Sequence, residues 1–116
     1  MSGKHGSASR HWRNQRMTSI ALLPLGLWFL FALLQQPSLE HAVVAGWFAR
    51  PLQALLGALF GATLLWHSMQ GLQVVIEDYA GGTLRSFWLG LSRLLHLAAG
   101  LVLAAALVWL AIGGAA

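Results

Sequence analysis

The chain has 116 residues and a formal net charge of +4, with no cysteine, only 3 acidic residues and 58% hydrophobic residues. This composition is too apolar for a soluble domain with a polar surface, and it predicts an all-α membrane protein. The absence of cysteine excludes disulfides and thiolate-held metal or iron–sulfur sites, while the basic residues flank apolar segments and do not form a nucleic-acid-binding patch.

The first third of the chain is a basic segment followed by an apolar one. We expect residues 1–16 to form a basic tail and residues 17–36 to form the first transmembrane helix, since about 20 apolar residues cross the hydrocarbon core. A cleaved signal peptide is the alternative explanation. The apolar run is long for a signal peptide, and no small-x-small cleavage site follows it directly.

A connector and a second apolar segment follow. Within the connector at residues 37–50, the apolar part at 42–48 is too short to span a bilayer, so we expect it to lie along the membrane interface. Residues 51–78 are expected to form the second transmembrane helix, with Pro51 suited to its first turn. The pair Gly57-x-x-x-Gly61 in this segment is a weak indication of close helix packing.

Glycines separate the second and third apolar segments. A tight turn at residues 79–85 would make the flanking helices antiparallel neighbours in a bundle of three. We expect the third transmembrane helix at residues 86–112 and a short tail at 113–116. The start of that helix depends on whether Arg93 snorkels from its first turns or marks the boundary.

The basic residues are distributed unevenly about the three spans. Six of them fall on one side: Lys4, Arg10, Arg13, Arg16, Arg85 and Arg93. Arg50 is alone on the other side, so the positive-inside rule predicts a cytoplasmic N-terminus and a periplasmic C-terminus. The tail lacks the arginine-rich amphipathic helix of a transit peptide, which favours a bacterial inner membrane.

The second span carries the chemistry. At about 100° and 1.5 Å per residue, the step from His67 to Asp78 returns to within roughly 20° of one helix face over about 16 Å. His67 is therefore expected near mid-membrane, where an imidazole can ligate haem iron, and Gly71 one turn away would let a flat macrocycle approach. The alternative is a histidine that donates one hydrogen bond to a neighbouring helix.

Asp78 and Tyr79 end the same span and also allow two interpretations. They form either a polar helix end with an interfacial aromatic anchor, or a proton-coupled site in which Tyr79 bonds a carbonyl oxygen and Asp78 orients it or relays protons. Arg16, at the start of the first span, has the ordinary interpretation of a snorkelling flank.

Two motifs together carry a family resemblance. Gln15-Arg16-Met17-Thr18 and His67-x-x-x-Gly71-x-Gln73-Val74-x-x-x-Asp78-Tyr79 resemble the hydrophobic membrane anchor subunits of succinate dehydrogenase, respiratory complex II. The match extends to the length, the three helices and the basic N-terminus. It implies a cytochrome b-type anchor that works with a second hydrophobic anchor subunit, an iron–sulfur subunit and a flavoprotein subunit.

The resemblance also implies roles for individual residues. His67 would be an axial ligand of haem b shared with the second anchor subunit, and Arg16 would lie near a haem propionate. Asp78 and Tyr79 would belong to the ubiquinone site. Neither flavin nor an iron–sulfur cluster is expected on this chain, so it would not oxidise succinate by itself. His96 is a minority candidate for the second haem ligand, because its depth approaches that of His67 if the third helix begins near Ser86.

The leading hypothesis is thus the anchor of a succinate:ubiquinone oxidoreductase. A fumarate reductase anchor and a stand-alone small cytochrome b share the same chemistry and differ in direction or partners. A cofactor-free structural or assembly protein, in which His67 only bridges helices, is the alternative from another class. A transporter is poorly supported, because the spans contain few ionisable residues and no inverted repeat.

Overall fold

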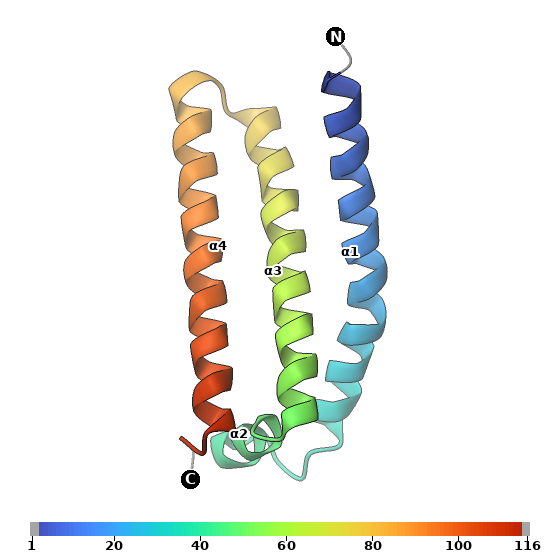
Figure 1. Cartoon of the computed structure of the whole chain (residues 1–116), viewed down its shortest axis with the longest axis vertical. Coiled ribbons are helices and arrows are strands. Elements are labelled where there is room, and N and C mark those ends of the chain that lie inside the picture. Colours follow the sequence, from blue (N-terminus) through green and yellow to red (C-terminus); the bar gives the residue numbers. More distant parts are fainter. Residues whose placement is uncertain (1–2, 115–116) are drawn as a thin grey trace.

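The computed structural model describes residues 3–114, with side chains from residue 6 onward; the Lys4 side chain and residues 115–116 fall outside it. Four helices make up the fold: α1 (Gly3–Leu34), α2 (His41–Phe48), α3 (Pro51–Tyr79) and α4 (Gly82–Ala111) (Figure 1). No strand occurs between residues 3 and 114. The predicted all-α class is confirmed.

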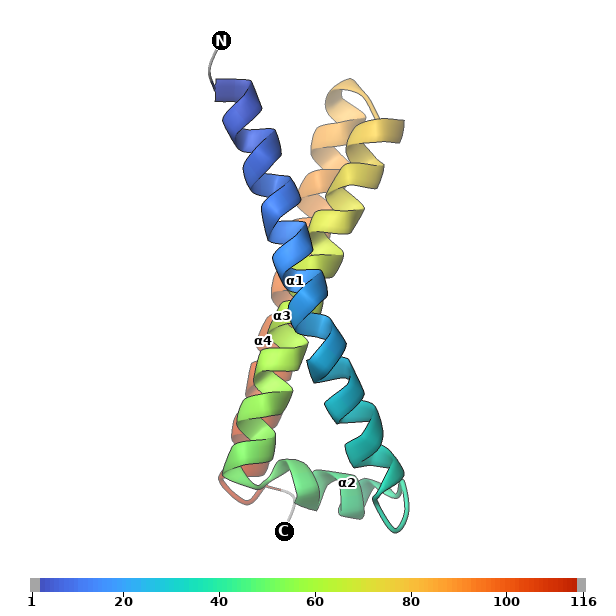
Figure 2. The same ribbon diagram turned by 90° about the vertical axis from the view of Figure 1, so that its right-hand side faces the viewer.

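The three long helices form a layer with α3 in the middle, in contact with both α1 and α4. The short α2 lies across one end of this layer and contacts α3 and α4, and α1 crosses α3 obliquely (Figure 2). Each long helix contains a stretch long and apolar enough to cross a bilayer, at Gly6–Leu34, Pro51–Tyr79 and Gly82–Ala111. The three predicted transmembrane helices are therefore confirmed. We call the end opposite α2, which carries the α3–α4 turn, the turn end.

The helix boundaries differ from the expected ones mainly at the turn end. Helix α1 begins at Gly3 and not at residue 17, so the described part of the expected tail is helical. Neither proline nor glycine interrupts residues 7–23, and an established helix extends through such a sequence at little cost. Helix α1 ends at Leu34, two residues early, and α3 ends at Tyr79, one residue late.

The turn between α3 and α4 is shorter than expected. Helix α4 begins at Gly82 and not at residue 86, which leaves only Ala80 and Gly81 between the two helices. Gly82 has φ +57°, a value that glycine adopts without the steric cost of a side chain. The chain thus reverses within a few residues and keeps α3 and α4 adjacent. At its other end, α4 stops at Ala111, one residue before the expected end of the span.

Aromatic rings pack α1, α2 and α3 together at the α2 end. Trp28 stacks on Trp47 with ring centroids 5.6 Å apart, and Phe29 lies 5.1 Å from Phe60 by the same measure. A Cβ added at the buried Gly57 would lie 2.7 Å from a ring carbon of Phe48, closer than real side chains approach. The first glycine of the Gly57-x-x-x-Gly61 pair therefore admits the α2 aromatic ring, while the second is covered by Leu103 of α4.

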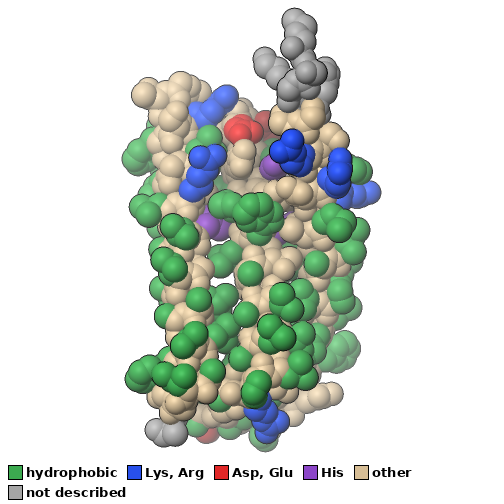
Figure 3. Space-filling model, in the orientation of Figure 1, with side chains coloured by type: hydrophobic (Ala, Val, Ile, Leu, Met, Phe, Trp, Pro, Cys, Tyr) green, Lys and Arg blue, Asp and Glu red, His purple; other side chains and the backbone are tan. Residues whose placement is uncertain are grey.

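The long helices exceed the thickness of a bilayer. At 1.5 Å per residue α3 and α4 are each about 44 Å long, against roughly 30 Å of hydrocarbon. If α2 marks one interface, the other falls about 20 residues along each span, close to Arg16, Gly71 and Arg93. Arg side chains gather toward the turn end above a broad apolar surface (Figure 3). On this placement His67 lies about 6 Å inside the second interface, shallower than the mid-membrane depth expected from sequence.

Candidate functional site

His67 lies on the side of α3 that faces α1, and its ring is fixed from that helix. Its Nδ1 is 2.9 Å from Oγ1 of Thr18. The single hydroxyl proton of Thr18 is directed to the backbone carbonyls of Asn14 and Gln15, each at 3.0 Å. With that proton on either carbonyl, Oγ1 of Thr18 can accept a hydrogen bond from Nδ1–H of His67, in the tautomer that is protonated at Nδ1. This tautomer leaves a lone pair on Nε2 of His67.

An apolar groove along α1 ends at this imidazole. It has a volume of about 570 Å³ and is lined by Ser19, Leu22, Leu23, Gly26, Leu27, Leu30 and His67. Among the described residues, Nε2 of His67 has no hydrogen-bond partner. We call this hollow the His67 groove. A free imidazole nitrogen beside an apolar hollow of this size is the arrangement that a planar metal-bearing cofactor requires.

Arg16 is close to Thr18 in sequence but not on the same side of α1. The two residues are separated by about 200° around the helix, so Arg16 projects nearly opposite to the residue that holds His67. Its guanidinium lies 5.3 Å from the ring centroid of Trp12, and its side chain is exposed. Within the described chain it has no ion-pair partner. The structure thus brings Thr18, and not Arg16, to His67.

Gly71 follows His67 by one turn of α3 but is covered by α1. A Cβ added at Gly71 would lie 3.6 Å from Nε2 of Gln15, an ordinary van der Waals distance. The glycine therefore lies at the contact between α1 and α3, outside the set of residues that line the His67 groove. A methyl group at this position would fit without displacing α1.

Asp78 and Tyr79 end α3 at the turn end, about 16 Å along the helix from His67. The Tyr79 side chain is 89% exposed, and that of Asp78 is exposed as well. Neither forms a hydrogen bond or ion pair with another described residue. The carboxylate and the phenol are accessible and adjacent, but this chain alone does not enclose them.

A second hollow lies between α1 and α3 nearer the turn end. It measures about 590 Å³ and is lined by Ser7, Ala8, His11, Trp12, Gln15, Gln73, Val74 and Glu77. Nε2 of His11 and Oε1 of Gln15 are buried there without a hydrogen-bond partner. Such atoms normally find water or a ligand group. This polar chamber separates the His67 groove from the end of α3.

The polar chamber is not among the sites expected from sequence, although a signal for it exists. Ser7, His11, Gln15 and Thr18 follow one another at intervals of four, four and three residues, which places them on one face of a helix. Residues 1–16 are expected to form a tail, and a spacing that matches a helix is informative only where a helix is expected. The Gln15–Thr18 motif includes Thr18 but does not predict its contact with His67.

His96 lies between α4 and α3, and both of its ring nitrogens are engaged. Nδ1 is 2.8 Å from the Ser92 carbonyl oxygen, which can only accept, so this nitrogen carries the proton. Nε2 is 3.1 Å from Oγ of Ser68 and therefore accepts that hydroxyl proton. In this arrangement His96 offers no free lone pair to a metal.

Most of the chain matches one family. Residues 2–110 match the model of the Succinate dehydrogenase/Fumarate reductase transmembrane subunit family. Relatives named as succinate dehydrogenase hydrophobic membrane anchor subunits include those of Rickettsia bellii (36% identical over 77 residues) and Paracoccus denitrificans (30% over 80 residues). These alignments cover 66% and 68% of this chain but only 62% and 61% of the relatives, less than two thirds of their lengths.

No solved structure gives a significant match. The family match nevertheless extends across all three apolar helices and includes the motifs around Thr18 and His67. It agrees with the resemblance carried by those motifs. The chain is a multi-pass membrane protein that belongs to the family of succinate dehydrogenase and fumarate reductase transmembrane subunits.

Proposed function

We propose that this chain is the membrane anchor of a succinate:ubiquinone oxidoreductase in a bacterial inner membrane. With a second hydrophobic anchor subunit it would hold the iron–sulfur and flavoprotein subunits at the cytoplasmic surface, with its own N-terminus on that side. The names of the relatives and the family match support an anchor role. The excess of basic residues at the turn end supports the orientation.

His67 is proposed as an axial ligand of haem b. The observation that carries this proposal is the bond from its Nδ1 to Thr18, which leaves Nε2 unprotonated beside the His67 groove. When bound, haem b would supply a one-electron carrier within the membrane. Because both nitrogens of His96 are engaged, the second axial ligand is proposed to come from the other anchor subunit.

Arg16 and Gly71 are also proposed to contact the haem, but each would require a side chain to move. Arg16 is at the level of the polar boundary, where a guanidinium can form a forked pair with a propionate. To do so it would leave its contact with Trp12 and reach around α1. Gly71 is proposed to lie close to the macrocycle, which would require the Gln15 side chain to move aside.

Asp78 and Tyr79 are proposed to contribute to ubiquinone reduction. The Tyr79 hydroxyl would donate a hydrogen bond to a quinone carbonyl oxygen, and Asp78 would orient that hydroxyl or deliver a proton. Both side chains are exposed in this chain, so the other walls of a quinone pocket would come from partner subunits. An iron–sulfur subunit at the turn end would bring its electrons to the same place.

Two of the three alternative functions rest on specific observations. The family includes transmembrane subunits of fumarate reductase, and nothing in the site fixes the direction of electron flow. The bond between Thr18 and His67 also satisfies the cofactor-free interpretation, in which the histidine only links two helices. A stand-alone small cytochrome b would use the same His67 ligand without hydrophilic partners.

Purification of the native complex through a tag on this chain distinguishes the proposed anchor from a stand-alone cytochrome and from a cofactor-free protein. We expect three further subunits, bound quinone, and a b-type absorption that succinate reduces. A haem protein that purifies as a homo-oligomer would instead support the stand-alone cytochrome. A complex without b-type absorption and without quinone would contradict our proposal and favour the cofactor-free interpretation.

Thr18 should control how well the site holds haem. In Thr18→Val the His67 ring loses its acceptor and its fixed tautomer, so we expect haem affinity to fall by about 10-fold to 100-fold, as for other outer-shell partners of metal ligands. The measurement is haem titration into the apo complex, followed by optical spectroscopy. Thr18→Ser retains the hydroxyl and should restore binding.

Thr63→Val is the matched control for this experiment. It removes a hydroxyl from α3 that bonds only the carbonyl oxygen of Leu59, 2.7 Å away. We expect its haem affinity to equal that of the unmodified complex. Equal haem affinity in the Thr18 and Thr63 variants would show that the hydroxyl at position 18 does not position His67.

A further inference from the structure

A long apolar groove runs between α3 and α4, apart from the His67 groove. Its upper part, about 320 Å³, is lined by Ala62, Leu65, Trp66, Met69, Arg93, His96, Leu97, Gly100 and Leu101. A second hollow of about 180 Å³ shares Ala62, Leu65 and Gly100 and continues toward the α2 end as far as Leu107. The two hollows together form what we call the α3–α4 groove.

Small residues from both helices form the floor of this groove. Ala58 and Ala62 of α3 face Gly100 and Ala104 of α4. A Cβ added at Gly100 would already lie 3.7 Å from Cδ1 of Leu65, so a larger side chain there would occupy the groove. From Arg93 to Leu107 the helix rises about 21 Å, comparable to an extended acyl chain of a phospholipid.

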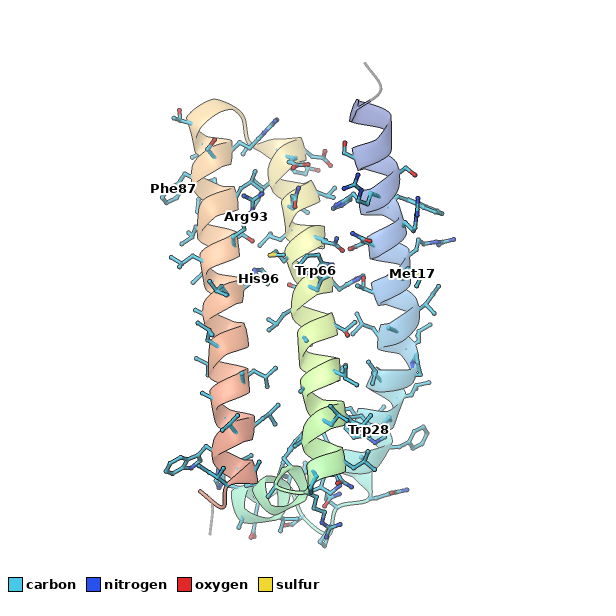
Figure 4. All side chains as sticks on the ribbon, viewed as in Figure 1. Met17, Trp28, Trp66, Phe87, Arg93 and His96 are labelled. Carbon is cyan, nitrogen blue, oxygen red and sulfur yellow. The ribbon has the colours of Figure 1, made fainter. Side chains whose placement is uncertain are left out.

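Arg93 lies at the end of the groove nearer the turn end. Figure 4 shows its side chain on the side of α4 toward α3, closer to the turn end than His96. The side chain is exposed and has no hydrogen bond or ion pair with any described residue. Its neighbour in the groove, His96, has both nitrogens engaged within the protein. Arg93 is thus a charged group of the groove without a protein partner among the described residues.

An anion beside Arg93 would stabilise its charge at this position in the bilayer. The three acidic residues are remote in the fold: Glu77 and Asp78 near the end of α3, and Glu40 at the α2 end. Measured from α2, Arg93 falls at the boundary of the hydrocarbon, where lipid phosphates lie. Arg85, by contrast, is occupied by the carbonyl oxygens of Ala80 and Glu77, at 2.9 and 3.0 Å.

We propose that the α3–α4 groove binds one phospholipid of the leaflet at the turn end. Arg93 donates hydrogen bonds to the lipid phosphate, and one acyl chain lies against Ala62, Leu65 and Gly100. The positive charge of Arg93 matches the phosphate of the headgroup, and the apolar groove that extends from it toward the α2 end matches the acyl chain. This site is separate from the proposed haem and quinone sites and does not depend on them.

Native mass spectrometry of the complex, released from nanodiscs that contain phosphatidylglycerol, tests the site. We expect retained lipid to fall about fivefold in Arg93→Gln, as loss of one arginine at a lipid surface implies. Arg85→Gln is the matched control because it removes the same charge from the same helix, and its retained lipid should not change. Equal retention in Arg93→Gln and the unmodified complex would overturn the proposal, as would equal losses in both variants.

A second variant tests the acyl chain without changing charge. Gly100→Leu fills the groove, and we expect it to reduce retained lipid and to abolish photo-crosslinking of a diazirine-labelled phospholipid to Ala62 and Leu65. Crosslinks should persist in Arg85→Gln. If the unmodified complex gives lipid crosslinks that never map to these residues, a protein segment, and not a lipid, covers the groove and the proposal is wrong.

Discussion

His67→Ala is expected to abolish the b-type spectrum of the assembled complex. The substitution removes the imidazole that lines the His67 groove, and none of the other residues that line the groove offers iron a strong ligand. We expect haem affinity to fall by more than about 100-fold, beyond the effect of losing an outer-shell partner alone. The measurement is the dithionite-reduced minus oxidised difference spectrum of the purified complex.

His96→Gln supplies the control for that experiment. It removes an imidazole of comparable depth that is bonded to Ser92 and Ser68, so haem should be retained. Added imidazole should partly restore the spectrum of His67→Ala, because a free ligand can enter an open groove. An unchanged spectrum in His67→Ala would show that His67 is not a haem ligand. Loss of haem in His96→Gln would indicate that His96 is one.

Tyr79→Phe is expected to slow succinate:quinone turnover by about 100-fold, the lower end of the range for removal of a group that assists proton transfer. The side chain is 89% exposed at the end of α3, so loss of its hydroxyl should leave the fold intact. Turnover is measured with a short-chain ubiquinone as acceptor. Unchanged quinone reduction would show that the Tyr79 hydroxyl takes no part.

Two controls separate the quinone site from the rest of the complex. Succinate oxidation with a water-soluble artificial acceptor bypasses the quinone and should proceed normally in Tyr79→Phe. Phe87→Leu changes another exposed aromatic residue near the turn end, on α4, and should not affect quinone reduction. A parallel loss of activity with both acceptors would indicate faulty assembly and contradict a specific role of Tyr79.

Apolar content made the main architecture predictable. The three spans follow from the low number of charges, because a bilayer admits only long, internally hydrogen-bonded helices across its core. The family could be recognised because Thr18, His67 and Asp78-Tyr79 occur in a fixed order and spacing along two helices. Hydrophobic pattern did not define the ends of α1 and α4, because polar residues also continue a helix outside the bilayer.

The sequence by itself thus determined the number of spans, the class and the family, and it identified His67 as the residue to examine. Only the tertiary structure showed that Thr18 holds Nδ1 of His67 while Ser92 and Ser68 occupy His96. Hydropathy is a property of one segment, whereas the tautomer of an imidazole depends on which neighbouring helix presents a donor or acceptor to it. The same reason applies to Arg93, whose lack of a partner became visible only when α3 and α4 were packed together.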